Sequence, residues 1–144
     1  MNMTSKYLHL IHDFFDSYAG AFEKFDARSM VKHFALPCML IDSDHAEVFA
    51  DAAKLEGQFS QGTQYYKQLG IMYARPEVWS KRLWTEGIVK VKVNWTYYDQ
   101  NKQKVYGCDY QYILRLTKRN QWQIELAASL NEKQHFEQWQ GRQK

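Results

Sequence analysis

The second half of the chain contains three stretches in which apolar and polar residues alternate one by one. They are residues 89–97, 110–116 and 122–128, and short polar segments at 99–103 and 118–120 separate them. Successive side chains of a strand point to opposite faces, so this pattern predicts long antiparallel strands with one apolar and one polar face. Such a sheet must have its apolar face covered before the chain can fold stably. This requirement limits the fold more than any other feature of the sequence.

The first half of the chain supplies helices that can cover this face. Apolar residues at three- and four-residue spacing predict an amphipathic helix near the N-terminus. This stripe comprises Tyr7, Ile11, Phe14, Tyr18, Phe22 and Phe25. Asp26 can cap a second helix over residues 27–34, which must stop before Pro37.

A third helix is predicted between Asp51, a favourable N-terminal cap, and Gly70, a favourable C-terminal residue. A short last helix is expected over residues 131–139. Helices followed by a meander of strands predict an α+β protein in which the N-terminal helices pack into a curved antiparallel sheet. Curling the sheet around the helices would give a cone.

An acidic segment, Asp42-Ser43-Asp44-His45, separates two short apolar runs near the second helix. One interpretation is a hairpin turn, because Asp and Ser readily bond to neighbouring backbone groups. The other is that Asp42 lies at the mouth of an apolar cavity, where burial would raise its pKa and make it a useful general base. Turns are the commoner use of such clusters, but the sequence leaves both interpretations open.

Composition favours one globular unit with more aromatic residues than a small core requires. A chain of 144 residues without repeats or linker-like tracts fits a single domain over residues 1–144. Aromatic residues make up 16% of the chain. This is more than one small core usually needs, so the rings either line a cavity or fill an aromatic core or a dimer interface.

Several classes of function are disfavoured. The net charge of +3 is scattered along the chain, which argues against nucleic acid binding. No hydrophobic run approaches membrane-spanning length and no signal peptide is visible, so we expect a cytoplasmic protein without membrane contact. Cys38 and Cys108 lie far apart in strand-like runs and are expected to be buried free thiols. Phosphate-binding and metal-binding motifs are missing, so no cofactor and no metal ion is expected.

Two long segments carry a resemblance to a known family. They are FDARSMVKHFALPCMLID, residues 25–42, and VNWTYYDQNKQKVYGCDYQYILRLTKRNQWQIELA, residues 93–127. Their pattern resembles the nuclear transport factor 2-like superfamily, also called SnoaL-like, and covers nearly the whole chain. The resemblance implies the cystatin-like roll of that superfamily, a cone that hosts isomerases, dehydratases, cyclases and non-enzymatic binding proteins.

Within this superfamily, the spacing of three residues is similar to that of ketosteroid isomerase. Counting from Phe34, which closes the predicted second helix, places Tyr18 sixteen residues before it and Asp42 eight residues after it. The resemblance implies that Asp42 is a catalytic base and that Tyr18 stabilises an oxyanion. The third position falls at Tyr112, where the family has a protonated aspartate. His33 and His45 are alternative bases, as histidines are in some enzymes of this fold.

We therefore expect a cone that binds a small, largely apolar molecule, with Trp95, Tyr97, Trp122 and Phe34 lining the wall. In an enzymatic form, Asp42 would move a proton while Tyr18 and Tyr112 hold the oxyanion. The alternative is a non-catalytic scaffold or protein-binding module. In either case we expect a homodimer through the polar sheet face, which carries Lys90, Lys92, Asn94, Gln123 and Glu125.

Overall fold

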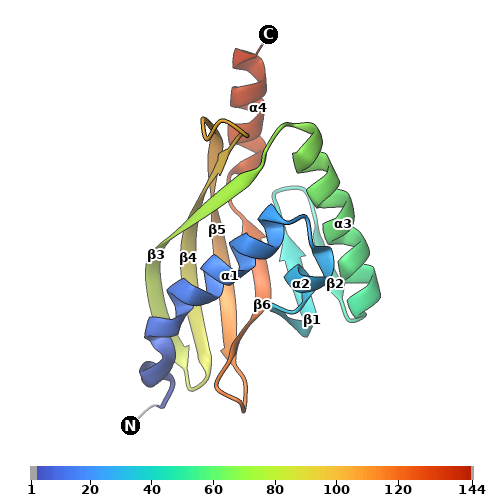
Figure 1. Ribbon diagram of the computed structural model, residues 1–144. Helices are drawn as coiled ribbons and strands as arrows, with labels where there is room; N and C mark the ends of the chain where they lie inside the picture. Colours follow the sequence, from blue (N-terminus) through green and yellow to red (C-terminus); the bar gives the residue numbers. More distant parts are fainter. Residues whose placement is uncertain (1–2, 144) are drawn as a thin grey trace.

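The computed structural model describes residues 3–143 and contains both helices and a single sheet (Figure 1). The helical elements are η1 (Met3–Leu10, a 3-10 helix), α1 (Ile11–Glu23), α2 (Ala27–Val31), α3 (Ala52–Gln68) and α4 (Glu132–Arg142). The strands are β1 (Phe34–Ile41), β2 (Ala46–Phe49), β3 (Tyr73–Thr85), β4 (Ile88–Tyr98), β5 (Lys104–Leu116) and β6 (Trp122–Ser129). The α+β class predicted from the sequence is confirmed.

The sheet has six strands in the order β2-β1-β6-β5-β4-β3. Strands β3 to β6 form the antiparallel meander, and β1 and β2 form an antiparallel hairpin. However, β1 pairs with β6 in parallel, so the sheet is mixed and not antiparallel throughout. The long excursion of the chain through α3 and the meander allows the last strand to join the first in this direction.

Alternation within the strands gives the sheet its two faces. On β4, the side chains of Val89, Val91 and Val93 are fully buried, while the lysines between them are only partly covered. The inward face of β5 presents Tyr112 and Leu114 in the same rows. Figure 1 shows α1 crossing this face of the sheet and α3 lying beside the β1–β2 hairpin. The core thus lies between the helices and the predicted apolar face.

Local capping chemistry sets where the helices begin. Asp26 Oδ1 accepts a hydrogen bond from the Ser29 amide at 3.1 Å, and Asp51 Oδ1 accepts one from the Ala53 amide at 2.7 Å. Both predicted caps are confirmed. Gly70 has a φ of 83°, a left-handed conformation that glycine adopts without strain, and it follows the end of α3.

Two helix boundaries differ from the predictions. The N-terminal helix is divided into η1 and α1, and the second helix ends at Val31, so it does not reach Phe34. Phe34 instead begins β1 and lies opposite Ile124 of β6. Pairing with a distant strand therefore outweighs the local helical pattern at this position.

Cys38 and Cys108 are buried free thiols, as predicted. Within residues 3–143, no helix is long and apolar enough to span a membrane. The described part of the chain also contains no group of three or more His, Cys, Asp or Glu side chains that could hold a metal ion.

Candidate ligand-binding cavity

Two adjoining cavities lie between α1, α3 and the helix-covered face of the sheet, each with a volume of about 220 Å³. The first, here called the tyrosine cavity, is bordered by Tyr66, Trp95 and Tyr97. The second, here called the hairpin cavity, is bordered by Phe34, Asp42 and other residues near the β1–β2 turn. The two share the wall residues Tyr18, Leu40, Gln58, Phe59, Tyr110 and Tyr112. Apolar side chains dominate the shared wall and a few polar groups interrupt it, as is usual for small-molecule sites.

Two phenol hydroxyls on this wall are available to donate hydrogen bonds. Tyr112 Oη accepts a hydrogen bond from Trp95 Nε1 at 2.9 Å, so its own proton is free for another acceptor. Within residues 3–143 the Tyr18 hydroxyl makes no hydrogen bond. Burial, followed by the charges of Cys38 and Glu132, raises the pKa of Tyr18, and burial followed by Tyr18 raises that of Tyr112. Both phenols therefore stay protonated at neutral pH.

A carboxylate from α4 organises three further tyrosines. Glu132 Oε2 accepts hydrogen bonds from the hydroxyls of Tyr66 and Tyr106, the second at 2.8 Å, and Oε1 accepts one from Tyr110 at 2.8 Å. Tyr66 and Tyr110 also line the tyrosine cavity. Burial, and after it the charge of Glu132, raises the pKa of both phenols. We call Tyr66, Tyr106, Tyr110 and Glu132 the carboxylate–tyrosine cluster.

Asp42 lies in the hairpin turn between β1 and β2. Its backbone amide donates to the His45 carbonyl at 2.9 Å, and its Oδ1 accepts from the amides of Asp44 and His45 at 2.8 and 2.9 Å. The side chain borders the hairpin cavity but is 46% exposed. Burial would raise the pKa of Asp42, but the backbone hydrogen bonds and the nearby His45 and Lys133 outweigh it, so the pKa lies below its ordinary value. Asp42 thus has the hydrogen bonds of a hairpin turn, which was the first of the two interpretations. Its lowered pKa also makes it a weak base.

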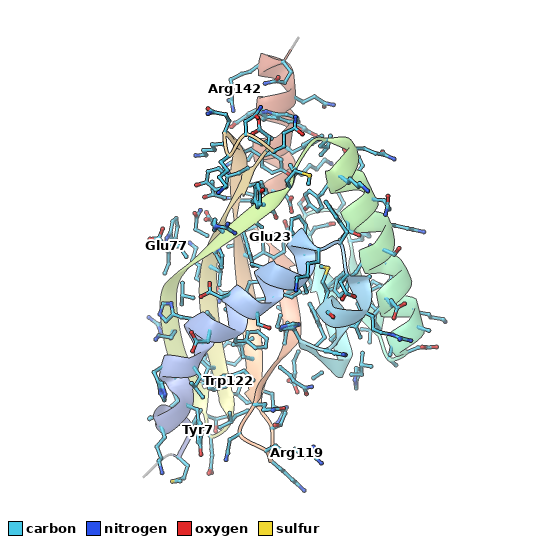
Figure 2. The ribbon with its side chains drawn as sticks, in the orientation of Figure 1. Tyr7, Glu23, Glu77, Arg119, Trp122 and Arg142 are labelled. Carbon is cyan, nitrogen blue, oxygen red and sulfur yellow. The ribbon has the colours of Figure 1, made fainter. Side chains whose placement is uncertain are left out.

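The predicted wall residues divide into two groups. Trp95 and Tyr97 line the tyrosine cavity, and Phe34 lines the hairpin cavity. Trp122 borders neither of these two cavities. Its indole Nε1 donates to the Tyr7 carbonyl at 2.9 Å, and Figure 2 shows both residues near the N-terminal end of the molecule. Trp122 is the first residue of β6 and faces the helix-covered side of the sheet, as the cavity residues do. It packs beside η1, because its indole bonds to Tyr7.

The two histidines proposed as alternative bases have different surroundings. His33 Nδ1 lies 2.8 Å from the carbonyl oxygen of Ser29, which can only accept, so Nδ1 carries the proton. His33 Nε2 lies 2.8 Å from Ser17 Oγ, and burial lowers the pKa of the ring. His45 is exposed and lies 3.1 Å from Asp42, at the edge of the hairpin cavity. His33 therefore joins α1 to α2 and does not border either cavity.

Comparison with known sequences identifies the family. The sequence profile of a family described as NTF2-like protein (DUF6841) matches residues 6–132. The chain belongs to this family. No curated protein matches it in sequence. The expected resemblance to nuclear transport factor 2-like proteins is therefore confirmed.

Solved structures show the same fold at low sequence identity. An NTF2-like protein of unknown function from Shewanella oneidensis MR-1 matches with a TM-score of 0.66 and 11% identity, over 83% of this chain and 95% of that one. A cystatin-like domain of unknown function from Nostoc punctiforme PCC 73102 gives a TM-score of 0.69 and 12% identity, over 88% and 78% of the two chains. A ketosteroid isomerase-like protein from Erwinia carotovora atroseptica SCRI1043 gives 0.61 and 12%, over 85% and 94%. Identities this low establish the fold of this NTF2-like protein and nothing finer.

Two cavity-lining residues of this NTF2-like protein, Tyr66 and Tyr110, and the carboxylate that accepts their hydrogen bonds, Glu132, were missed by sequence reasoning. Tyr110 shares its strand face with Tyr112, two residues away, so the alternation already placed it on the cavity side. Tyr66 lies on α3, inside the helix predicted between Asp51 and Gly70. Glu132 carried no recognisable signal, because only the docking of α4 on the sheet brings it to the tyrosines.

Proposed function

We propose that this NTF2-like protein binds a small, largely apolar molecule whose acceptor oxygen lies between the hydroxyls of Tyr18 and Tyr112. The observation that carries the proposal is that Tyr18 and Tyr112 both line the same two cavities and that neither hydroxyl donates to a residue of the described chain. A carbonyl or similar oxygen would satisfy both donors. The surrounding rings would cover the apolar part of the ligand.

An enzymatic form of the proposal adds proton transfer. Two phenols that line one cavity and have protons to donate can stabilise negative charge that develops on a carbonyl oxygen. One similar structure is called ketosteroid isomerase-like, and this name motivates a reaction in which Asp42 moves a proton. The lowered pKa of Asp42 supports binding more strongly than catalysis, because a weak base limits such a step.

The test is the affinity for acetophenone, a small ketone with an apolar ring, measured by titration calorimetry. Tyr18→Phe and Tyr112→Phe each remove one hydrogen bond to the carbonyl, so each should weaken binding by about fivefold to tenfold. Tyr65→Phe is the matched control, because Tyr65 lies on α3 and is 49% exposed. Equal affinities in the wild type and both cavity variants would show that the phenols do not hold the ketone.

We also propose that two copies of the chain associate through the outer face of the sheet. Strand register places Lys90, Ile113 and Leu126 in one row across β4, β5 and β6. The row continues through Met39 of β1 to Val48 of β2, which is 59% exposed. The outer face was expected to be polar, but this row gives it an apolar strip. An apolar strip with a polar surround suits a two-fold interface between copies.

Light scattering of the purified protein at high concentration tests the association. The wild type should have the mass of a dimer. Leu126→Lys should give a monomer, because it places a charge in the middle of the strip. Leu130→Lys serves as the control, since Leu130 is exposed outside the row. A monomeric wild type would refute the dimer without affecting the ligand proposal.

A further inference from the structure

The directions of the hydrogen bonds around the tyrosine cavity give it two chemically different ends. At one end, Tyr66 and Tyr110 donate their protons to Glu132. A phenol has one proton, and an ionised carboxylate can only accept. Toward the cavity, these two hydroxyls therefore present lone pairs and no proton. They can accept a hydrogen bond from a ligand but cannot donate one.

Further contacts hold these protons in place. Tyr106 donates to the same carboxylate oxygen as Tyr66, so three donors surround one carboxylate. Burial and the negative charge of Glu132 raise the pKa of Tyr66 and Tyr110, which keeps both protonated. Tyr97, at the same end, has its hydroxyl 3.8 Å from the Cys108 thiol, which donates to it. The charge of Glu132 also favours a positively polarised hydrogen at this end of the cavity.

The other end has the opposite polarity. Tyr112 accepts from Trp95 Nε1 and so directs its own proton elsewhere, and the Tyr18 hydroxyl makes no hydrogen bond to residues 3–143. The two ends are close, because Tyr110 and Tyr112 stack with ring centroids 5.6 Å apart and an angle of 16° between their planes. One small molecule can therefore contact a donating phenol and an accepting phenol at once.

From this geometry we infer that the ligand carries a hydroxyl or amine donor in addition to its acceptor oxygen, and that Glu132 sets this selectivity by fixing the direction of the Tyr66 and Tyr110 hydrogen bonds. The inference rests on the proposed function, because the donor end is the site of the acceptor oxygen. Glu132 is a positioning residue here, since it acts on the ligand through the phenols.

The experiment compares acetophenone with 3- and 4-hydroxyacetophenone and with the methyl ethers of both phenols. The two isomers sample different spacings between the polar ends, and the ethers remove only the donated proton. In the wild type, the better hydroxyl compound should bind about fivefold to tenfold more tightly than acetophenone and than its own ether. 3- and 4-Aminoacetophenone extend the comparison from hydroxyl to amine donors.

Glu132→Gln tests the role of the carboxylate with almost no change of shape. The amide has one accepting oxygen and a donating nitrogen, so at least one phenol must turn its proton away from residue 132. The advantage of the hydroxyl compound should disappear, while acetophenone affinity stays within about twofold. Glu137→Gln makes the same chemical change on an exposed part of α4 and should keep the advantage. If Glu132→Gln does not fold, Tyr110→Phe removes one accepting oxygen and should also abolish the advantage.

The outcomes separate the two proposals. Acetophenone binding that depends on Tyr18, without any gain from a hydroxyl or amine, would overturn the two-ended cavity and leave the proposed function intact. A gain that persists in Glu132→Gln would overturn the role of the carboxylate. No binding of acetophenone, or binding insensitive to Tyr18→Phe, would overturn the proposed function and this inference with it.

Discussion

The buried hydrogen bond between Trp95 and Tyr112 gives the sharpest test of the donor end. Trp95 is 4% exposed and Tyr112 is 2% exposed, and Trp95 Nε1 lies 2.9 Å from Tyr112 Oη. Tyr112→Phe removes the acceptor but not the donor, so it leaves a buried N–H group without a partner. Such a group costs about 1–3 kcal/mol. Since the neighbouring cavity can admit water, we expect a loss of about 1–2 kcal/mol in the free energy of unfolding.

A double-mutant cycle isolates this bond from the change in packing. Trp95→Phe removes the donor and part of a buried ring, at a cost of about 2–3 kcal/mol. On that background, Tyr112→Phe no longer leaves an orphaned N–H group, so its additional cost should fall to about 0.5 kcal/mol. The expected coupling energy is therefore about 1 kcal/mol.

Urea unfolding gives the free energy of unfolding of the wild type, the two single variants and the double variant. Far-ultraviolet circular dichroism follows the transition, because this signal does not depend on the fluorescence of Trp95. In heating experiments, Tyr112→Phe should lower the Tm by about 3–6 °C, because 1 kcal/mol corresponds to about 2–4 °C in a domain of this size. The Tyr65→Phe control should leave stability nearly unchanged. A coupling energy within about 0.3 kcal/mol of zero would show that the bond does not form, and the Tyr112 proton would then have no fixed direction.

Three further predictions concern stability. Glu132→Ala should lower the free energy of unfolding by about 3 kcal/mol, because three phenols lose a charged acceptor, whereas Glu137→Ala should have little effect in the same urea titration. Burial lowers the pKa of His33, so the unfolded chain takes up a proton first as the pH falls below about 6.5. Stability should therefore decrease from pH 7.5 to pH 5.5, and less so in His33→Gln; equal pH profiles would contradict this reasoning. Asp51→Ala should cost about 1 kcal/mol by removing the N-terminal cap of α3, and Asp51→Asn should restore most of it.

Part of the candidate site was predictable, because the spacing of apolar residues shows which side of a strand or helix faces the core. Tyr112 lies in the alternating β5 strand and Tyr18 lies on the apolar stripe of α1, so both had to point into the core. The family resemblance then suggested that they share a cavity, and the structure places both on its wall. Trp122 also belongs to an alternating stretch, but it lies at the start of β6. The alternation therefore predicted which face of the sheet it occupies, but not its position along the strand direction relative to the cavities.

Asp42 shows a different limit. The sequence placed it correctly after an apolar strand and left two interpretations. Its hydrogen bonds with the backbone of Asp44 and His45 are local, and they give a turn with a lowered pKa. What the sequence could not supply was the exposure of the carboxylate, which depends on how the hairpin packs against α3 and α4.

The sequence by itself determined the α+β class, the buried face of β4 and the caps at Asp26 and Asp51, since these depend on neighbours within a few residues. Only the tertiary structure decided that β1 joins β6 in parallel and that Glu132 meets Tyr66, which is 66 positions away. Periodicity states which way a side chain points. It does not state which distant side chain it meets, because that depends on how whole helices and strands dock.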